Sequence, residues 1–258
     1  MTGATFDAMA GDYDRNFTDT VIGRTMREVV WRRCDACFAP GMRVLEINCG
    51  TGEDAVYLGR RGVRVLATDV STAMVERARV KSALAGVGAL VETAALRIED
   101  VGPEIGRFDG VLSNFGGLNC VPDLARAALG LASVVTTGGV ALLTVMGPLV
   151  PWEWAWYLSH GELTRATRRL TPGGTPWRDI VIRYPRPAAL ARAFAPAFRL
   201  RRVAALGALL PPPFAEDWAA RHPRATQWLA RTERRFDTQW PLTELGDHYI
   251  AEFERVAP

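Results

Sequence analysis

The chain has 258 residues, of which 48% are hydrophobic and 23% charged, and this composition predicts one globular domain with a sizeable core and room for a small appended subdomain. No apolar stretch reaches the roughly 18 residues of a membrane-spanning helix, and the N-terminus is acidic where a signal peptide is basic and then apolar, so we expect a cytoplasmic protein without a membrane partner. The formal net charge of +3 is too small to indicate a nucleic-acid partner.

In the first half of the chain, short apolar runs alternate with helical periodicity, which predicts a parallel sheet covered on both faces by helices. The predicted strands are 42–47, a second ending at Asp69, 90–93, one in 108–117 and 138–147. A short helix is expected over 53–61. Ser71 is a candidate N-cap for the next helix, with apolar positions at 74, 75, 78 and 84. Pro122 is expected in the first turn of a helix that runs to about residue 135.

After residue 147 this rhythm stops. Residues 148–186 predict an insertion with a Trp-rich helix, a basic helix, a Gly/Pro loop and a strand, packed over the edge of the sheet. A helix over 188–194, a sixth strand in "FRLRRVAALGALL" and a last strand in "GDHYIAEFERV" follow. The halves differ in charge, since residues 1–147 carry 15 basic and 17 acidic side chains and residues 148–258 carry 16 and 11.

The four cysteines include one C-x-x-C pair, Cys34 and Cys37. This pair falls inside a probable helix and has no second pair, so we expect small buried thiols and no metal site.

The stretch "VLEINCGTGEDAVYLG" (44–59) places Gly50 and Gly52 in a turn between the first strand and a helix. These letters fit the dinucleotide fingerprint G-x-G-x-x-A, and they also fit E-x-N-x-G-x-G, a signature for S-adenosylmethionine with Asn48 at a glycine position. Glu53 and Asp54 follow at the helix N-terminus, where they would repel a pyrophosphate. S-adenosylmethionine has an ammonium and a sulfonium and no phosphate, so the charge favours this cofactor.

Taken with "VLATDVSTAMVERA", "LRIEDV", "RFDGVLSNFGGLNCV" and "TTGGVALLTV", this stretch resembles the class I S-adenosylmethionine-dependent methyltransferases over about residues 5–147. The resemblance implies an α/β fold with a Rossmann-like, doubly wound, seven-stranded sheet, mostly parallel with an antiparallel last strand. It also divides the chain into N-terminal lid helices (1–40), a cofactor-binding core (41–147), a lid insertion after the fifth strand (148–186) and a C-terminal completion of the sheet (187–258).

The resemblance also implies roles for individual residues in binding the cofactor. Glu46, Gly50 and Gly52 would line its methionine portion, which Tyr13 in "FDAMAGDYDRNF" would cover. Asp69 would hold the ribose, Val70, Ile98 and Glu99 would surround the adenine, and Asn114 and Phe115 would lie beneath the sulfonium.

Two positions depart from the family pattern. Asn48 replaces the first glycine, and asparagine tolerates a left-handed backbone better than other non-glycine residues, so we expect the turn to survive and to gain an amide. Arg97 stands where many members have an acidic residue, so Asp100 is a second candidate for the adenine amino group.

Methyl transfer needs a base only when the acceptor holds a proton. The three histidines, His160, His222 and His248, all follow the fifth strand. If the last strand is antiparallel, His248 lies near its beginning at the active edge, and His222 follows the connection on that edge. These two are the candidate bases, with a structural role as the alternative for each.

The insertion carries the candidate acceptor contacts. "PWEWAWYLSHGEL" places Trp152 and Trp156 on one helical face, and with His160 they predict a cover over an apolar or planar acceptor, or else a packing or dimer surface. Arg165, Arg168 and Arg169 could meet an acidic group of the substrate, or form a solvated helix face.

The sequence therefore predicts a monomeric or dimeric methyltransferase that transfers a methyl group from S-adenosylmethionine to an O, N or C atom of a largely hydrophobic small molecule of specialised metabolism, with oxygen as the default. Asn48 and the lack of an obvious catalytic dyad keep open a non-methylating enzyme or binding scaffold on the same fold. A lesser alternative is an NAD-dependent dehydrogenase.

Overall fold

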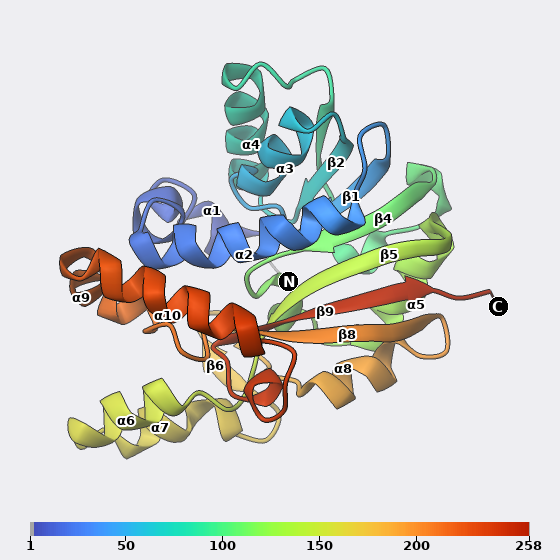
Figure 1. Ribbon diagram of the computed structural model, residues 1–258. Helices are drawn as coiled ribbons and strands as arrows, with labels where there is room; N and C mark the ends of the chain where they lie inside the picture. Colours follow the sequence, from blue (N-terminus) through green and yellow to red (C-terminus); the bar gives the residue numbers. More distant parts are fainter. Residues whose placement is uncertain (1–2, 258) are drawn as a thin grey trace.

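The computed structural model describes residues 3–257, and seven strands form one sheet in the order β3-β2-β1-β4-β5-β9-β8. All neighbouring pairs are parallel except those made by β9, which lies antiparallel between β5 and β8 (Figure 1). This confirms the predicted mostly parallel sheet with an antiparallel last strand. The strands are β1 (Arg43–Ile47), β2 (Arg64–Asp69), β3 (Val91–Ala95), β4 (Phe108–Ser113), β5 (Val135–Met146), β8 (Phe198–Leu206) and β9 (His248–Arg255).

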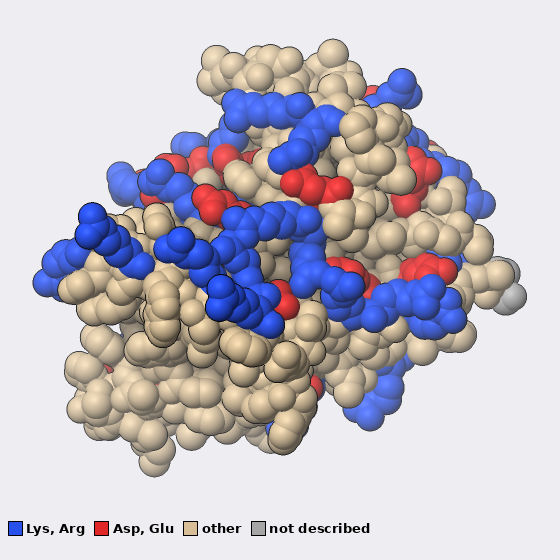
Figure 2. Space-filling view, in the orientation of Figure 1, with Lys and Arg blue, Asp and Glu red and all other residues tan. Residues whose placement is uncertain are grey.

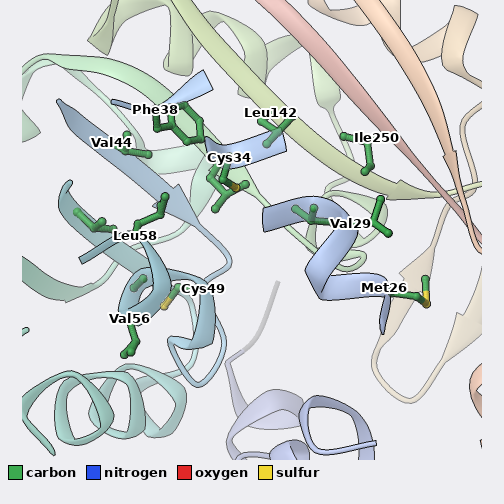
Figure 3. Packing of buried hydrophobic residues seen from close by; sticks show 14 of the residues in the cluster. Met26, Val29, Cys34, Phe38, Val44, Cys49, Val56, Leu58, Leu142 and Ile250 are labelled. Atoms are coloured by element: carbon green, nitrogen blue, oxygen red, sulfur yellow. The ribbon is translucent and has the colours of Figure 1, made fainter. Parts of the chain in front are cut away.

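Helices cover both faces of the sheet and enclose two hydrophobic cores. One core contains residues of α2 (Val21–Cys37), α3 (Glu53–Arg60), α4 (Thr72–Leu84) and α10 (Pro223–Phe236). The other contains residues of α5 (Leu124–Val134) and α8 (Pro187–Phe194). Figure 3 shows Met26, Val29 and Cys34 of α2 in the first core, with Leu142 of β5 and Ile250 of β9. Burial of apolar surface on both faces is what the continuous apolar strands predicted.

The helix starts follow their capping residues. Ser71 Oγ accepts a hydrogen bond from Met74 N at 3.1 Å, which confirms the predicted N-cap of α4. The prediction for the fifth helix was wrong by two residues, because Asp123 is its N-cap and accepts from Arg126 N at 2.9 Å, so Pro122 precedes the helix. Leu84, expected on the apolar face of α4, is 85% exposed at the end of that helix.

Two groups of elements lie at the carboxyl ends of the parallel strands. The N-terminal segment forms α1 (Ala4–Asp7) and a π-helix, η1 (Asp14–Thr18). The insertion forms α6 (Pro151–Ser159), α7 (Leu163–Thr167) and the hairpin of β6 (Thr175–Trp177) with β7 (Ile180–Ile182), in the lower left of Figure 1.

Two helices between β8 and β9, α9 (Glu216–Arg221) and α10, were not predicted. Short 3-10 turns complete the chain: η2 (Ile98–Asp100), η3 (Pro103–Ile105), η4 (Gly117–Cys120), η5 (Arg168–Leu170), η6 (Pro213–Ala215) and η7 (Leu242–Glu244). Over residues 3–257, no helix combines the length and the apolar character that crossing a membrane requires. Figure 2 shows basic side chains spread over the face where α10 lies, whereas the region of α6 and α7 is mostly uncharged on this side.

Candidate functional site

Two cavities lie side by side at the carboxyl ends of the parallel strands. The first has a volume of about 260 Å³ and the second about 630 Å³. They share Met9, Tyr13, Phe115 and Met146 in their walls. In open α/β sheets this edge is where ligands bind. Of the predicted cofactor residues, the first cavity is lined by Tyr13, Asn48, Gly50, Asp69, Val70, Asn114 and Phe115.

The turn after β1 has the backbone that the glycine motif predicts. Asn48, Gly50 and Gly52 all have positive φ, of 56°, 54° and 79°. A Cβ on Gly52 would lie 2.6 Å from Ala78 Cβ, so the glycine allows α3 and α4 to approach closely. The Asn48 side chain occupies space that Gly117 leaves open, since a Cβ there would lie 2.4 Å from Asn48 Cβ. Asn48 Nδ2 is buried without a hydrogen-bond partner beside the first cavity.

Asp69 ends β2 at the wall of the first cavity. Its Oδ2 accepts from Gly50 N at 3.0 Å and its Oδ1 from Ser71 N at 2.9 Å. Burial raises the pKa of Asp69, and the backbone N–H groups of Ser71 and Gly50 oppose that shift. The carboxylate is thus fixed in direction and each oxygen retains a lone pair for a hydroxyl donor.

Asn114 and Phe115 follow β4; both line the first cavity, and Phe115 also lines the second. Phe115 has a positive φ of 48°, which is unfavourable for an aromatic residue and is typical of functional sites. Asn114 Oδ1 accepts from Phe115 N at 3.0 Å, and this bond stabilises the turn. The Phe115 ring contacts Phe17 at 4.8 Å and His248 at 5.6 Å between centroids, and the Arg27 guanidinium lies 4.7 Å above it.

The electrostatic premise for choosing the cofactor was wrong. Asp54 is buried and paired, with Arg27 Nη1 at 2.5 Å, Asn114 Nδ2 at 2.9 Å and Trp31 Nε1 at 2.7 Å. Glu53 pairs with Lys81 Nζ at 3.0 Å. Because Asp54 is paired with Arg27 and Glu53 shares Lys81 with Asp14, these carboxylates are not the two free charges that the sequence suggested.

The N-terminal segment closes over the first cavity and is held by two sets of polar contacts. Asp7 Oδ1 accepts from Ser71 Oγ at 2.6 Å, and Asp14 meets Thr51 Oγ1 at 2.6 Å and Lys81 Nζ at 2.8 Å. Between them, Tyr13 lies against both cavities.

Four predicted cofactor residues lie outside the lining of the first cavity. Gly52 lies deeper, at the start of α3, and Ile98 is buried in the core. Glu46 is 1% exposed, burial raises its pKa well above the ordinary value, and Oε2 has no hydrogen-bond partner. The carboxylate oxygens of Glu99 are also buried without a hydrogen-bond partner.

His248 is the first residue of β9 and lines the second cavity. Its Nδ1 lies 2.9 Å from Asp247 Oδ2, close enough for an ion pair when the ring is protonated, although this ring nitrogen makes no regular hydrogen bond. Burial alone would raise the pKa of Asp247, but the charges of Arg169 and His248 hold it well below its usual range. Asp247 is therefore ionised beside the ring.

Arg169 connects the insertion to this pair. Its guanidinium is 6% exposed and donates to Glu153 at 2.6 and 3.1 Å, to Asp247 Oδ1 at 2.5 Å, and to the backbone oxygens of Gly147 and Asp247 at 3.1 and 3.0 Å. These contacts join η5 and α6 to the end of β5 and the start of β9. The expectation that Arg169 meets a substrate or solvent was wrong, because its donors are used within the protein.

Of the other predicted site residues, Arg168 lines the second cavity, whereas His160, His222, Trp152 and Trp156 lie outside both cavities. His222 is exposed, with Nδ1 2.9 Å from Trp218 O, and His160 is exposed, with Nδ1 2.8 Å from Trp156 O. Trp152 and Trp156 are 41% and 45% exposed, and Trp156 packs against Phe214. The helix α6 presents Glu153 to the interior, so Trp152 and Trp156 are exposed, while Trp154 and Tyr157 are half-buried.

Several residues of the site were missed by sequence reasoning. Arg27 comes from α2, whose helical pattern gave no signal of a buried cation. Trp177 and Ile182 of the β6–β7 hairpin line the first cavity. Cys120 also lines it, and burial raises its pKa to about 11, so it remains a thiol.

Comparisons with known proteins agree with this geometry. Residues 44–139 match the model of a methyltransferase domain. The chain is 36% identical over 151 residues to the demethylmenaquinone methyltransferase of Beutenbergia cavernae. The aligned stretch covers 57% of this chain and 58% of the relative. It is 26% identical over 147 residues to the tRNA 5-carboxymethoxyuridine methyltransferase of Escherichia coli K12, over 55% of this chain and 56% of the relative.

A solved structure supports the same fold. Magnesium protoporphyrin IX methyltransferase from Synechocystis PCC 6803, with bound S-adenosylhomocysteine (SAH), aligns with a TM-score of 0.54 and 18% identity over 90% of this chain and 82% of the other. The chain spans a little more than half the length of the curated relatives described above. It carries a methyltransferase domain of the class I S-adenosylmethionine-dependent family.

Proposed function

We propose that this protein transfers a methyl group from S-adenosylmethionine, held in the first cavity, to a largely hydrophobic small molecule in the second, with oxygen as the default acceptor atom. The observation that carries this proposal is the wall shared by the two cavities, in which Tyr13, Phe115 and Met146 face both. Direct transfer requires the acceptor atom to contact the methyl group, so the two ligands would have to meet at this shared boundary, between its side chains.

The residues of the first cavity fit this cofactor. Asp69 offers carboxylate oxygens to ribose hydroxyls, and Val70 and Met74 offer apolar contact to a base. Asn48 Nδ2, buried without a partner, would donate to a carboxylate, and Glu46 Oε2, which is buried outside the lining, is a proposed contact for the ammonium. Ile98 and Glu99 remain proposed contacts at the adenine side.

The bound cofactor would supply an electrophilic methyl group on sulfur. Phe17, Phe115 and Met146 would exclude water and align the acceptor. For a hydroxyl acceptor, His248 Nε2 would take the proton while an oxygen lone pair forms the new C–O bond, and the electrons of the broken C–S bond would stay on sulfur. Asp247, ionised next to Nδ1, would stabilise the imidazolium.

The proposal retains His248 as the base and drops His222, His160, Trp152 and Trp156 as site residues, because they lie outside both cavities. A non-methylating protein on the same fold remains the alternative.

Calorimetric titration with S-adenosylmethionine, SAH and NAD tests the cofactor. We expect binding of the first two, and binding of NAD alone would refute the proposal. Formation of SAH with a metabolite extract tests the activity, and tight cofactor binding without any turnover would favour the scaffold.

A further inference from the structure

Several charged residues line the second cavity, but only some of them have charged groups that are free to bind a ligand. Glu153 and Asp247 are 4% and 5% exposed, and their oxygens are directed at Arg169. Asp12, on the N-terminal segment, pairs with Arg15 at 2.8 Å. Two further lining residues, Arg168 and Arg178, lie on the insertion side and are more accessible than Glu153 and Asp247, so that side of the cavity offers guanidinium groups to a ligand, while the 62% exposed Asp12 lies on the opposite, N-terminal segment.

Arg178 occupies a strained position. It is the first of two residues that connect β6 and β7, where Trp177 pairs with Ile180, and its φ is +54°. Glycine is favoured at this place in a two-residue hairpin, so an arginine costs backbone energy. Such an outlier is a reason to look for function. Here the guanidinium lies 4.9 Å from the Trp177 ring centroid and lines the second cavity, while Trp177 lines the first.

Arg168 is held in place without using its whole guanidinium. Its Nη2 donates to Glu153 Oε1 at 2.7 Å, and the group lies 5.2 Å from the Tyr157 ring centroid. A guanidinium has five N–H donors in a planar fork, so the bond to Glu153 leaves others to bind a carboxylate. The side chain is 28% exposed, whereas that of neighbouring Arg169 is 6% exposed.

We infer that the methyl acceptor is an organic acid, whose carboxylate or similar anionic group binds Arg168 and Arg178 on the insertion side of the second cavity. This inference rests on the proposed function, since it assigns the acceptor to this cavity. The body of the molecule would lie against Phe17, Phe115 and Phe214, which favours a planar, apolar shape. His248 and the shared wall would face the reacting atom.

Benzoate and benzamide provide a test, because they have the same shape and differ in charge. In the presence of SAH, we expect the wild-type protein to bind benzoate at least about tenfold more tightly than benzamide, as one charge-assisted hydrogen-bonded group predicts. Arg178→Asn removes the charge and places an asparagine, which tolerates positive φ, in the turn. Arg168→Gln removes the second guanidinium. Each variant should lose most of the preference for benzoate.

Arg165→Gln is the matched control, because Arg165 lies in the same insertion, is 65% exposed, pairs with Glu162 and does not line the cavity. It should keep the full preference. Equal affinity for the two probes in the wild type, absence of benzoate binding at millimolar concentration, or an unchanged preference in both arginine variants would overturn the inference. Failure of the proposed function would appear separately, as absence of SAH binding to the wild-type protein in the calorimetric titration with S-adenosylmethionine, SAH and NAD.

Discussion

Replacing Arg169 by methionine tests whether the insertion is fixed to the sheet by buried charge. Arg169 is the cation shared by two buried carboxylates, Glu153 at 2.6 Å and Asp247 at 2.5 Å, and it also satisfies the backbone oxygens of Gly147 and Asp247. Removing one partner of a buried ion pair costs about 3–5 kcal/mol. Asp247 loses its guanidinium here, while Glu153 keeps its ion pair with Arg168 at 2.7 Å, so we expect the free energy of unfolding at pH 7 to fall by about 3–5 kcal/mol.

The pH dependence separates charge from packing. The pKa of Asp247 lies below its unfolded value, so the stabilisation it brings is complete above about pH 4 and is lost as the pH falls through the lower folded value. In Arg169→Met, burial without the arginine raises the pKa of Asp247, and the carboxyl group can take up a proton. The deficit relative to wild type should therefore be largest near neutral pH and shrink towards about pH 4.5.

Urea unfolding at several pH values measures this deficit. Arg165→Met is the control, because its exposed ion pair should be worth less than about 1 kcal/mol. Arg169→Lys keeps the charge and loses the forked geometry, so it should lie between the wild type and Arg169→Met. A cost of Arg169→Met no greater than that of Arg165→Met, or a deficit that stays constant with pH, would show that buried charge does not fix the insertion to the sheet.

Three further predictions concern the two cavities. Asp69→Ala should weaken SAH binding by about 1.5–3 kcal/mol in calorimetry, as loss of a charged hydrogen-bond acceptor predicts, and unchanged affinity would show that the ribose lies elsewhere. Asn48→Gly should leave the free energy of unfolding within about 1 kcal/mol of wild type, while Asn48→Ala should cost about 1–2 kcal/mol because of the positive φ, and equal effects would contradict a left-handed backbone there. His248→Gln should lower kcat with a hydroxyl acceptor by about 10²–10⁴-fold at unchanged SAH affinity, and an unchanged kcat would exclude it as the base.

The alternation of strands and helices followed from local sequence signals, whereas the seven-stranded sheet with its antiparallel last strand was implied by the family resemblance. Apolar runs alternating with helical periodicity predicted strands and helices, and right-handed parallel crossovers leave few ways to connect them. The positive φ at Asn48 was also foreseeable, because it replaces a glycine in a turn that needs that backbone. The N-cap at Ser71 could also be predicted, because a capping hydroxyl binds a backbone N–H within three residues of its own position.

Ion pairs between side chains of distant segments could not be predicted from the sequence. Asp54 and Glu53 looked like free charges beside the glycine turn until Arg27 and Lys81, from two other helices, were placed against them. Which face of the Trp-rich helix is exposed could not be predicted either. It depends on the burial of Glu153, whose partner Arg169 lies sixteen residues further along the chain.

The sequence by itself determined the fold and the family and predicted the edge of the sheet where ligands would bind, because each motif that carries them is a pattern within a few residues. The tertiary structure decided which charges are consumed inside the protein and which face the second cavity. It joined Asp247, the neighbour of His248, to Arg169, and it left Arg168 and Arg178 accessible. The physical reason is that ion pairs act over a few ångströms in space, and the chain brings such partners together only when it folds.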